Sequence, residues 1–252
     1  PGFSLHLILA NRDGAVWLSA SLPPDRPEYP DISTVFPYAI RQQRAMADLL
    51  GIHAADAGST IDRRPWLRHT VWTATQHPLR HDFATADDKT VAPEELYPFV
   101  QVEGEGVHEI PVGPIHAGII EPGHFRFSIV GEKVLRLEER LGYKHKGIDK
   151  RFSALTLVQR AQLAGRVSGD STVAYAWAYA MAHETICEAT PPMRAQWLRA
   201  LFLERERIAN HLGDLGALGN DGGLAFGLTQ FMRLKEDVLR LNARVAGHRY
   251  LM

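Results

Sequence analysis

The chain has 252 residues, of which 45% are hydrophobic and 23% are charged, and its formal net charge at pH 7 is -1. This composition is typical of a globular protein with one large or two ordinary domains. The near-neutral charge excludes the large basic excess of a nucleic-acid-binding protein. No apolar run approaches the roughly 18 residues of a membrane-spanning helix, and no secretory signal peptide is visible. We therefore expect no transmembrane segment in this chain.

Cysteine usage limits the chemistry further. The single cysteine, Cys187, excludes an internal disulfide framework and a cluster held by four thiolates of this chain. Because Cys187 ends an alanine-rich helical segment, we expect it to be a buried structural thiol. The chain begins with Pro1 rather than methionine, so we expect either a fragment or a processed protein.

The N-terminal part of the chain predicts a small α/β domain. Two β-type runs, 4–10 and 15–22, flank a turn with Gly14, which is the pattern of a β-hairpin. The proline-rich segment 23–30 is expected to be an extended loop, because proline is excluded from helices and inner strands. A helical pattern then covers 38–50 and ends at a glycine.

The rest of the chain predicts a small sheet followed by a helical bundle. The polar segment 82–98 is the expected linker between two domains, which cover residues 1–90 and 91–252. The fold class is therefore α+β. We expect strands at 99–102 and 107–112, a hairpin from 125–130 and 133–137, and helices at 149–186, 193–215 and 224–245. The alanine-rich stretch 172–182 is expected to be buried in the bundle, and the apolar residues of 193–215, such as Trp197, are expected to form its core.

Two adjoining segments combine turn-forming residues with titratable side chains. They are 110–118, IPVGPIHAG, and 121–127, EPGHFRF. Glycine and proline fix unusual backbone geometry, so a rigid turn is expected to present these polar groups. The side chains presented there are His116, Glu121, His124 and Arg126.

These segments resemble the opening of the large subunit of membrane-bound nickel–iron hydrogenases of the formate hydrogenlyase type. That subunit is similar in turn to the D-type peripheral-arm subunit of respiratory complex I. The continuation 141–150, LGYKHKGIDK, resembles the next segment of the same family. The helix ending at 48–52, DLLGI, and the later 77–83, HPLRHDF, resemble the C-type subunit of complex I. The resemblance implies a fused C–D-type chain with a C-terminally incomplete hydrogenase-like domain.

A nickel–iron hydrogenase holds its metals with two Cys-x-x-Cys pairs, of which the first lies in an Arg-x-Cys-Gly-x-Cys motif. The matching run here is 166–172, RVSGDST, in which both cysteines are serines, Ser168 and Ser171. Nickel and iron need soft thiolates, and a serine hydroxyl is a hard, weakly acidic oxygen. The second pair is expected beyond Met252. The resemblance therefore implies a hydrogenase fold without the metal ligands.

In complex I the corresponding cavity takes a quinone headgroup, bound by a histidine of the hairpin and a tyrosine of the helix side. His116 and His124 supply the hairpin side here, and their spacing does not decide between them. The tyrosine position falls at Gly169, while Tyr175 and Tyr179 follow further along the helix. The implied quinone site is therefore incomplete on the helix side.

The resemblance also assigns candidate proton carriers. Glu121 matches the proton-relaying glutamate of the hydrogenase hairpin, and Asp170 places a carboxylate in the vacated pocket. A carboxylic acid in a partly dry cavity can have a raised pKa and carry protons; the alternative is a structural salt bridge to Arg126 or Arg166. The candidate catalytic residues are Glu121, His124, Arg126 and Asp170, and the candidate cofactor-binding residues are His116, Arg166, Ser168 and Ser171.

The resemblance leaves three hypotheses. The first is a subunit of a complex I-like, membrane-associated oxidoreductase that docks an iron–sulfur small subunit and lines a quinone-type or proton-coupling cavity. The second is a catalytically silent scaffold and proton-coupling subunit, between the iron–sulfur arm and membrane antiporter-like subunits. The third, an active nickel–iron hydrogenase, is opposed by Ser168 and Ser171. Under the first two, the chain is peripheral on the cytoplasmic side of the membrane and holds no cofactor itself. The iron–sulfur cluster then lies in a partner subunit, and quinone is the candidate ligand.

Overall fold

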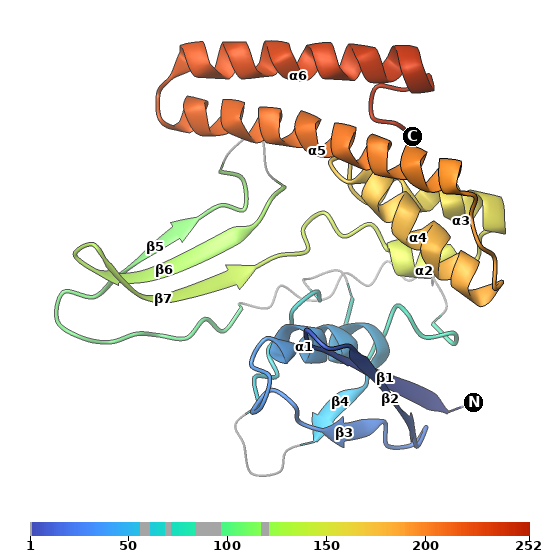
Figure 1. Cartoon of the computed structure of the whole chain (residues 1–252). Helices are drawn as coiled ribbons and strands as arrows, with labels where there is room; N and C mark the ends of the chain where they lie inside the picture. Colours follow the sequence, from blue (N-terminus) through green and yellow to red (C-terminus); the bar gives the residue numbers. More distant parts are fainter. Residues whose placement is uncertain (1, 56–60, 69–71, 84–96, 117–120) are drawn as a thin grey trace. The chain divides into compact units, whose positions relative to one another are not determined.

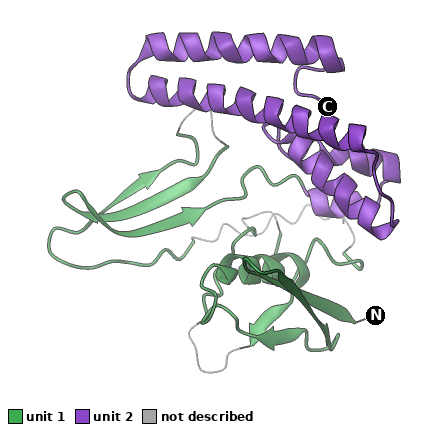
Figure 2. Cartoon of the chain, viewed as in Figure 1, with its two compact units in different colours: residues 1–146 green, residues 147–252 purple. Residues whose placement is uncertain are grey.

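The computed structural model describes residues 2–55, 61–68, 72–83, 97–116 and 121–252. Figure 2 shows that the chain forms two compact units, 1–146 and 147–252. Within the described residues the fold is mixed α/β, with three small sheets and six helices (Figure 1). The expected fold class is confirmed at this level, while the predicted domains over 1–90 and 91–252 stay a prediction.

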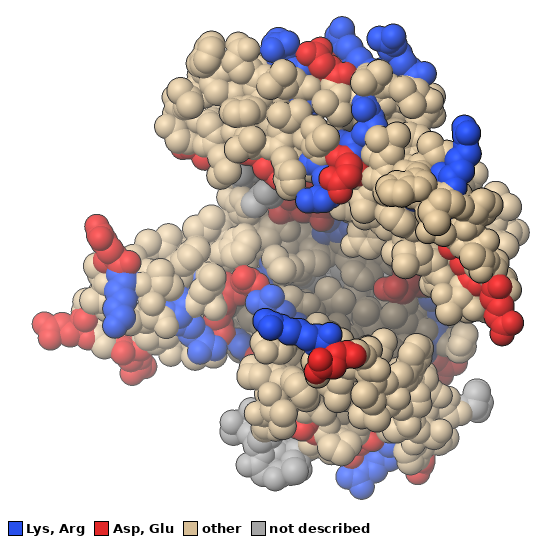
Figure 3. Space-filling view, viewed as in Figure 1, with Lys and Arg blue, Asp and Glu red and all other residues tan. Residues whose placement is uncertain are grey.

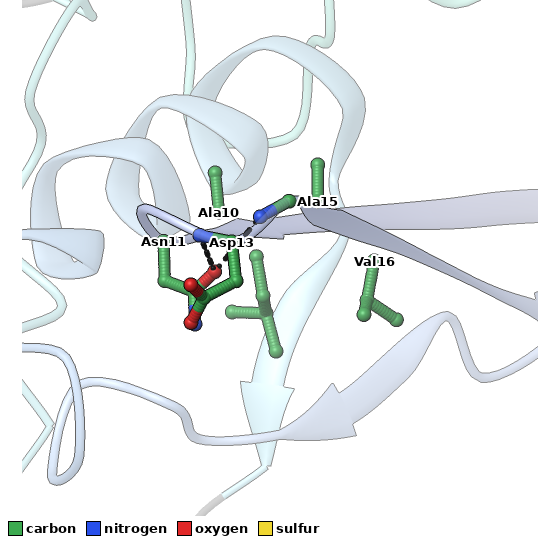
Figure 4. A pocket seen from close by; sticks show the side chains of 7 residues that line it. Ala10, Asn11, Asp13, Ala15 and Val16 are labelled. Carbon is green, nitrogen blue, oxygen red and sulfur yellow. Dashed lines mark hydrogen bonds between the residues drawn. The ribbon is translucent and has the colours of Figure 1, made fainter.

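The expected N-terminal hairpin is confirmed. Strands β1 (Phe3–Ala10) and β2 (Ala15–Leu22) pair antiparallel along their whole length. Their turn is closed by Asn11, whose side-chain oxygen accepts hydrogen bonds from the backbone N–H groups of Asp13 at 2.9 Å and Gly14 at 3.0 Å (Figure 4). An asparagine side chain that bonds the backbone two residues ahead is a common turn device.

A short β–α–β unit follows. Strand β3 (Glu28–Pro30) pairs in parallel with β4 (His53–Ala55), and helix α1 (Ala39–Leu50) connects them. The end of the proline-rich segment is therefore a strand rather than a loop, which proline tolerates because β3 pairs only with β4 within the described ranges. Helix α1 ends as predicted, at Gly51 with φ +69°, where a side chain would collide with the ring of His77.

The third sheet of this unit has three antiparallel strands. They are β5 (His108–Val112), β6 (His124–Val130) and β7 (Lys133–Arg140), in the order β5-β6-β7. The hairpin is confirmed, but 99–102 forms no strand. Phe99 instead places its ring 5.4 Å from that of His124 and 4.7 Å from that of Tyr97, so ring contacts rather than strand pairing hold this residue.

Charged side chains join this sheet to the N-terminal part of the unit. Arg64 bonds Glu138 at 2.9 Å, and Arg41 bonds Glu139 at 2.8 Å. Burial acts to raise the pKa of Glu138, but hydrogen bonds from Val100, Arg136 and Arg64 outweigh it and lower that pKa. The carboxylate is therefore held in its ionised form at neutral pH.

The second unit is helical, but the single segment expected over 149–186 is three helices. They are α2 (Ile148–Ser153), α3 (Leu157–Ala164) and α4 (Thr172–Ile186). A capping box between Thr156 and Gln159 starts α3 anew, because the two side chains satisfy helix N–H groups that a continuous helix would not leave free. Residues 165–171 form the loop before α4.

Helices α5 (Met193–Asp221) and α6 (Ala225–Ala246) pack against each other as a long hairpin (Figure 1). The expected burial of the apolar residues of α5 was wrong. These residues are largely exposed, with Trp197 at 70% and Leu201 at 51%, because the buried face is made mainly of small residues instead. The buried residues of α5 are Glu206, Ala209, Gly213 and Gly216.

Helix α4 and the cysteine after it also differ from expectation. Only Thr172 and Val173 of α4 are buried, and Ile186 is 80% exposed. Cys187 is exposed rather than buried, because it lies just past the end of α4 and outside its packed first turn. None of the helices in the described residues has the length and apolar content of a membrane span. On the face drawn in Figure 3, positive and negative side chains are interspersed.

Candidate functional site

The turn between β5 and β6 is closed by its own backbone. Gly113 has φ +79°, and a side chain there would collide with the carbonyl of Gly123. The N–H of Gly123 donates to the carbonyl of Pro114 at 2.9 Å, across the base of the loop. The Gly113–Pro114 peptide bond is cis. Glycine and proline therefore shape the backbone that carries the candidate side chains, as expected from their types.

Two half-buried histidines lie at this turn. His124 begins β6, and its Nδ1 is 3.3 Å from the carbonyl oxygen of Gly113. Its Nε2 is buried and meets no hydrogen-bond partner within the described part of the chain. The ring of His116 lies 5.7 Å from that of Phe125. His124 therefore has one ring nitrogen engaged and one left for another group.

Arg126 is committed to a pair that the sequence did not indicate. Its guanidinium donates to Glu109 of β5 at 3.0 Å, and it lies 4.2 Å over the ring of Phe99. Glu121, whose salt bridge to Arg126 was the alternative to a proton-carrying role, is exposed. The register explains the pairing, because Pro111 faces Arg126 and Glu109 is the diagonal neighbour two residues away. The sequence could have indicated this pair only through the alternation of side chains along β5, which places Glu109 and Pro111 on the same face of the strand.

The loop over 165–171 carries the other four candidates. Ser168 and Ser171 are half-buried, and the N–H of Ser171 donates to the carbonyl of Ser168 at 3.3 Å. Asp170 and Arg166 are exposed. Arg166 donates to the carbonyl of Gln162 at 3.0 Å, so the salt bridge with Asp170 weighed as an alternative is not what this loop forms.

A buried carboxylate of α5, Glu206, supports this loop and was missed by sequence reasoning. It accepts hydrogen bonds from the N–H groups of Val173 at 2.5 Å and Ala174 at 3.2 Å, at the start of α4. Burial raises the pKa of Glu206, the two N–H groups lower it and the charge of Asp170 raises it, and the net direction is upward. The sequence could have indicated the burial of Glu206 only through its helical spacing, since Glu206 shares a helix face with Ala209 and Gly213.

Asn210 holds the same loop at a second point. Its side-chain amide donates to the backbone carbonyl of Asp170. Ser171, at the N-cap position of α4, makes no side-chain capping bond, although serine is a preferred N-cap residue. Side chains of α5, rather than the side chain of Ser171, therefore make the hydrogen bonds to the end of this loop and the start of α4.

The structure groups the eight predicted site residues by unit. One group lies on the β5–β6 turn and the first residues of β6, and the other lies on the loop before α4. That the two groups face one cavity stays a prediction. Of the two tyrosines considered, Tyr175 is exposed, and the ring of Tyr179 lies 5.8 Å from that of Phe152.

The donor set of the 165–171 loop does not fit a nickel–iron centre. Its two ligand positions are hydroxyls, which are hard oxygen donors where soft thiolates are needed. Elsewhere in the described ranges, the His, Cys, Asp and Glu side chains form no group of three or more that could hold a metal ion.

Comparisons with known proteins give the wider context. Residues 2–89 match the family described as respiratory-chain NADH dehydrogenase, 30 Kd subunit. The chain is 31% identical to hydrogenase-4 component G of Escherichia coli (strain K12), over 92% of this chain and 42% of that protein. It is 29% identical to formate hydrogenlyase subunit 5 of the same organism, over 98% of this chain and 44% of that protein. It is 25% identical to the C/D subunit of NADH-quinone oxidoreductase of Gluconacetobacter diazotrophicus, over 96% and 43%.

Over nearly its whole length the chain is therefore similar to subunits of hydrogenases and of NADH-quinone oxidoreductases. More narrowly, residues 2–89 match the 30 Kd subunit family of respiratory-chain NADH dehydrogenase, and the chain is homologous to formate hydrogenlyase- and C/D-type subunits. The resemblance drawn from the sequence is confirmed. The chain spans less than half the length of these relatives.

Proposed function

We propose that this chain is part of a subunit of a complex I-like, membrane-associated oxidoreductase. In this proposal the loop before α4 lines a quinone-type or proton-coupling cavity that holds no nickel–iron centre. The observation that carries the proposal is the presence of Ser168 and Ser171 at both ligand positions, in a loop that Glu206 and Asn210 still hold in place. A loop that has lost its thiolates but kept its support is suited to a different use of the same space.

The candidate residues then have distinct roles. His124 would use Nε2 either to donate a hydrogen bond to a quinone carbonyl or to accept one from the hydroxyl of the reduced quinol, because Nδ1 already faces the carbonyl of Gly113. Asp170 and Glu121 would carry protons, and both are exposed enough to exchange them with water. Arg126 would keep a fixed positive charge beside His124 through its pair with Glu109. His116, Arg166, Ser168 and Ser171 would bind the ligand.

The partners follow from the same proposal. The protein would dock an iron–sulfur small subunit, whose cluster would deliver electrons, and would lie on the cytoplasmic side of membrane antiporter-like subunits. The names of the relatives, as hydrogenase and NADH-quinone oxidoreductase components, support this assignment. The chain would be peripheral, and nucleic acid would not be a partner.

One observation favours the scaffold as a second candidate. The position that matches the quinone-binding tyrosine is Gly169, and Tyr175, six residues further along, is exposed. Without an aromatic hydroxyl on the helix side, the cavity would have to bind quinone mainly through the histidines. A silent subunit would instead keep the fold only to connect its partners.

Quinone-dependent turnover of the native complex tests the proposal. Asp170→Asn removes the proton carrier and is expected to lower turnover by about 100-fold, the size of a lost acid–base group. Ser168→Tyr fills the vacated position and is expected to raise the KM for quinone. Asp237→Asn is the matched control, since Asp237 is 61% exposed and pairs with Arg233 one turn away. Wild-type quinone kinetics in both site variants, with the complex assembled, would leave the scaffold as the function.

A further inference from the structure

Glu206 is a buried carboxylate in the middle of an otherwise amphipathic helix. It is 9% exposed, whereas Glu204, two residues earlier on α5, is 57% exposed and pairs with Arg207 at the surface. Burying a carboxylate is costly unless hydrogen bonds and charge compensate for the lost water. The contacts of Glu206 therefore have to explain its position.

Glu206 contacts two free backbone N–H groups in the first turn of α4. Val173 and Ala174 are the second and third residues of that helix, and their N–H groups have no partner within the helix itself. The carboxylate accepts both, at 2.5 Å through Oε2 and at 3.2 Å through Oε1. A negative charge at a helix N-terminus is also favoured by the helix dipole. Glu206 thus caps α4 from a neighbouring helix.

Asn210 lies one helical turn after Glu206, so both side chains leave the same side of α5. It bonds the backbone carbonyl of Asp170, while Glu206 bonds the N–H groups of residues 173 and 174. The two anchors lie on either side of Ser171. A change in the hydrogen bonds between Glu206 and α4 is therefore expected to change the backbone position of the Ser168–Ser171 loop.

Three elements surround Glu206, namely the loop before α4, the start of α4 and α5 itself. Asp170, on the loop, acts on it as a like charge. Its neighbours on α5 are engaged elsewhere, because Arg205 bonds Asn242 of α6 at 2.6 Å and Arg207 bonds Glu204. The first turn of α4 carries no acidic residue and contributes its N-terminal dipole. Protonation of Glu206 is thus set by burial, the helix start and Asp170.

We propose that Glu206 is a positioning residue for the Ser168–Ser171 loop and that the geometry of this loop follows the protonation of Glu206. This inference rests on the proposed function, in which that loop lines the cavity. Uptake of one proton from water turns a carboxylate that accepts on both oxygens into an acid with one donating oxygen, and no electron moves. The longer bond, from Ala174, is the one expected to break. The Thr172 hydroxyl, on the same turn, is buried and has no hydrogen-bond partner among the described residues, which makes it the candidate acceptor for the new O–H.

The test is a pH titration of backbone amide resonances in the full chain, labelled with nitrogen-15. The amides of Ser171, Val173 and Ala174 are expected to shift together, with one midpoint above the usual glutamate value of about 4.3. Glu206→Gln should abolish the titration. Glu204→Gln, the matched control, should leave it unchanged. Asp170→Asn should move the midpoint down, because it removes the like charge.

Two results would overturn the inference. One is a set of amides that does not titrate in the wild-type chain between pH 4 and 8, and the other is a titration that survives Glu206→Gln. If Glu206→Gln fails to fold, the titration of Asp170→Asn alone decides. An unchanged midpoint in Asp170→Asn would then reject the inference. The proposed function fails separately, since quinone turnover in the native complex plays no part in the amide titration.

Discussion

At the scale of single residues, support for the candidate site comes from positions that carry no obvious functional signal. Glu206 and Glu109 are ordinary charged residues in the sequence, and each becomes informative only through a contact far along the chain. A charged residue in an amphipathic helix is normally assigned to the solvent side. Burial and pairing over 33 residues cannot be predicted from such a pattern. The candidate residues themselves were chosen from local features, namely glycine, proline and the two serines, and their roles stay predictions.

Gly113 gives a prediction at this scale. Replacing it with alanine should destabilise the chain by more than about 1 kcal/mol, because alanine is strained at positive φ and its side chain would collide with the carbonyl of Gly123. Thermal or denaturant unfolding measures the loss. Gly131→Ala is the matched control, since it also has positive φ but an added side chain would meet nothing within 4 Å. Equal losses in the two variants would show that the close approach at Gly113 is unimportant.

At the scale of elements, the features that depend on local sequence were predicted well, and those that depend on packing between elements were not. The hairpins β1–β2 and β6–β7 and the end of α1 follow from alternation and turn glycines, and all three are confirmed. The break of 149–186 into three helices depends on the capping box at Thr156, which the periodicity hid. The prediction that the large apolar residues of α5 are buried was wrong, because small residues of α5 contact α6 instead.

The α5–α6 hairpin gives the prediction at this scale. Asn242 is 1% exposed, accepts from Arg205 at 2.6 Å and donates to the carbonyl of Arg249 at 3.1 Å. Asn242→Ala removes the hydrogen-bond partner of the half-buried Arg205 Nε and of the half-buried Arg249 carbonyl, and it should cost about 1–3 kcal/mol of unfolding free energy. Chemical denaturation of the chain measures it. Arg233→Ala, which removes one surface ion pair, should change stability by less than about 1 kcal/mol. A loss no larger for Asn242→Ala than for this control would contradict the packing described.

At the scale of the whole molecule, the resemblance drawn from the sequence motifs agrees with the domain match over 2–89 and with the homologues. What the motifs could not give is the relation between the β5–β6 turn and the loop before α4, because that relation depends on tertiary packing rather than on local sequence. The proposed loss of the metal centre therefore rests on chemistry. Two hydroxyls stand where thiolates would be needed, and hard oxygen donors do not hold nickel and iron in a hydrogenase centre.

Nickel content of the native complex, measured by elemental analysis together with hydrogen-dependent viologen reduction, decides whether the metal centre is lost. We predict no nickel above background and no hydrogen-dependent reduction, with quinone-dependent turnover then measured on the same preparation. Stoichiometric nickel with hydrogen-dependent activity would contradict this prediction, because it would show that Ser168 and Ser171 do not prevent assembly of the metal centre.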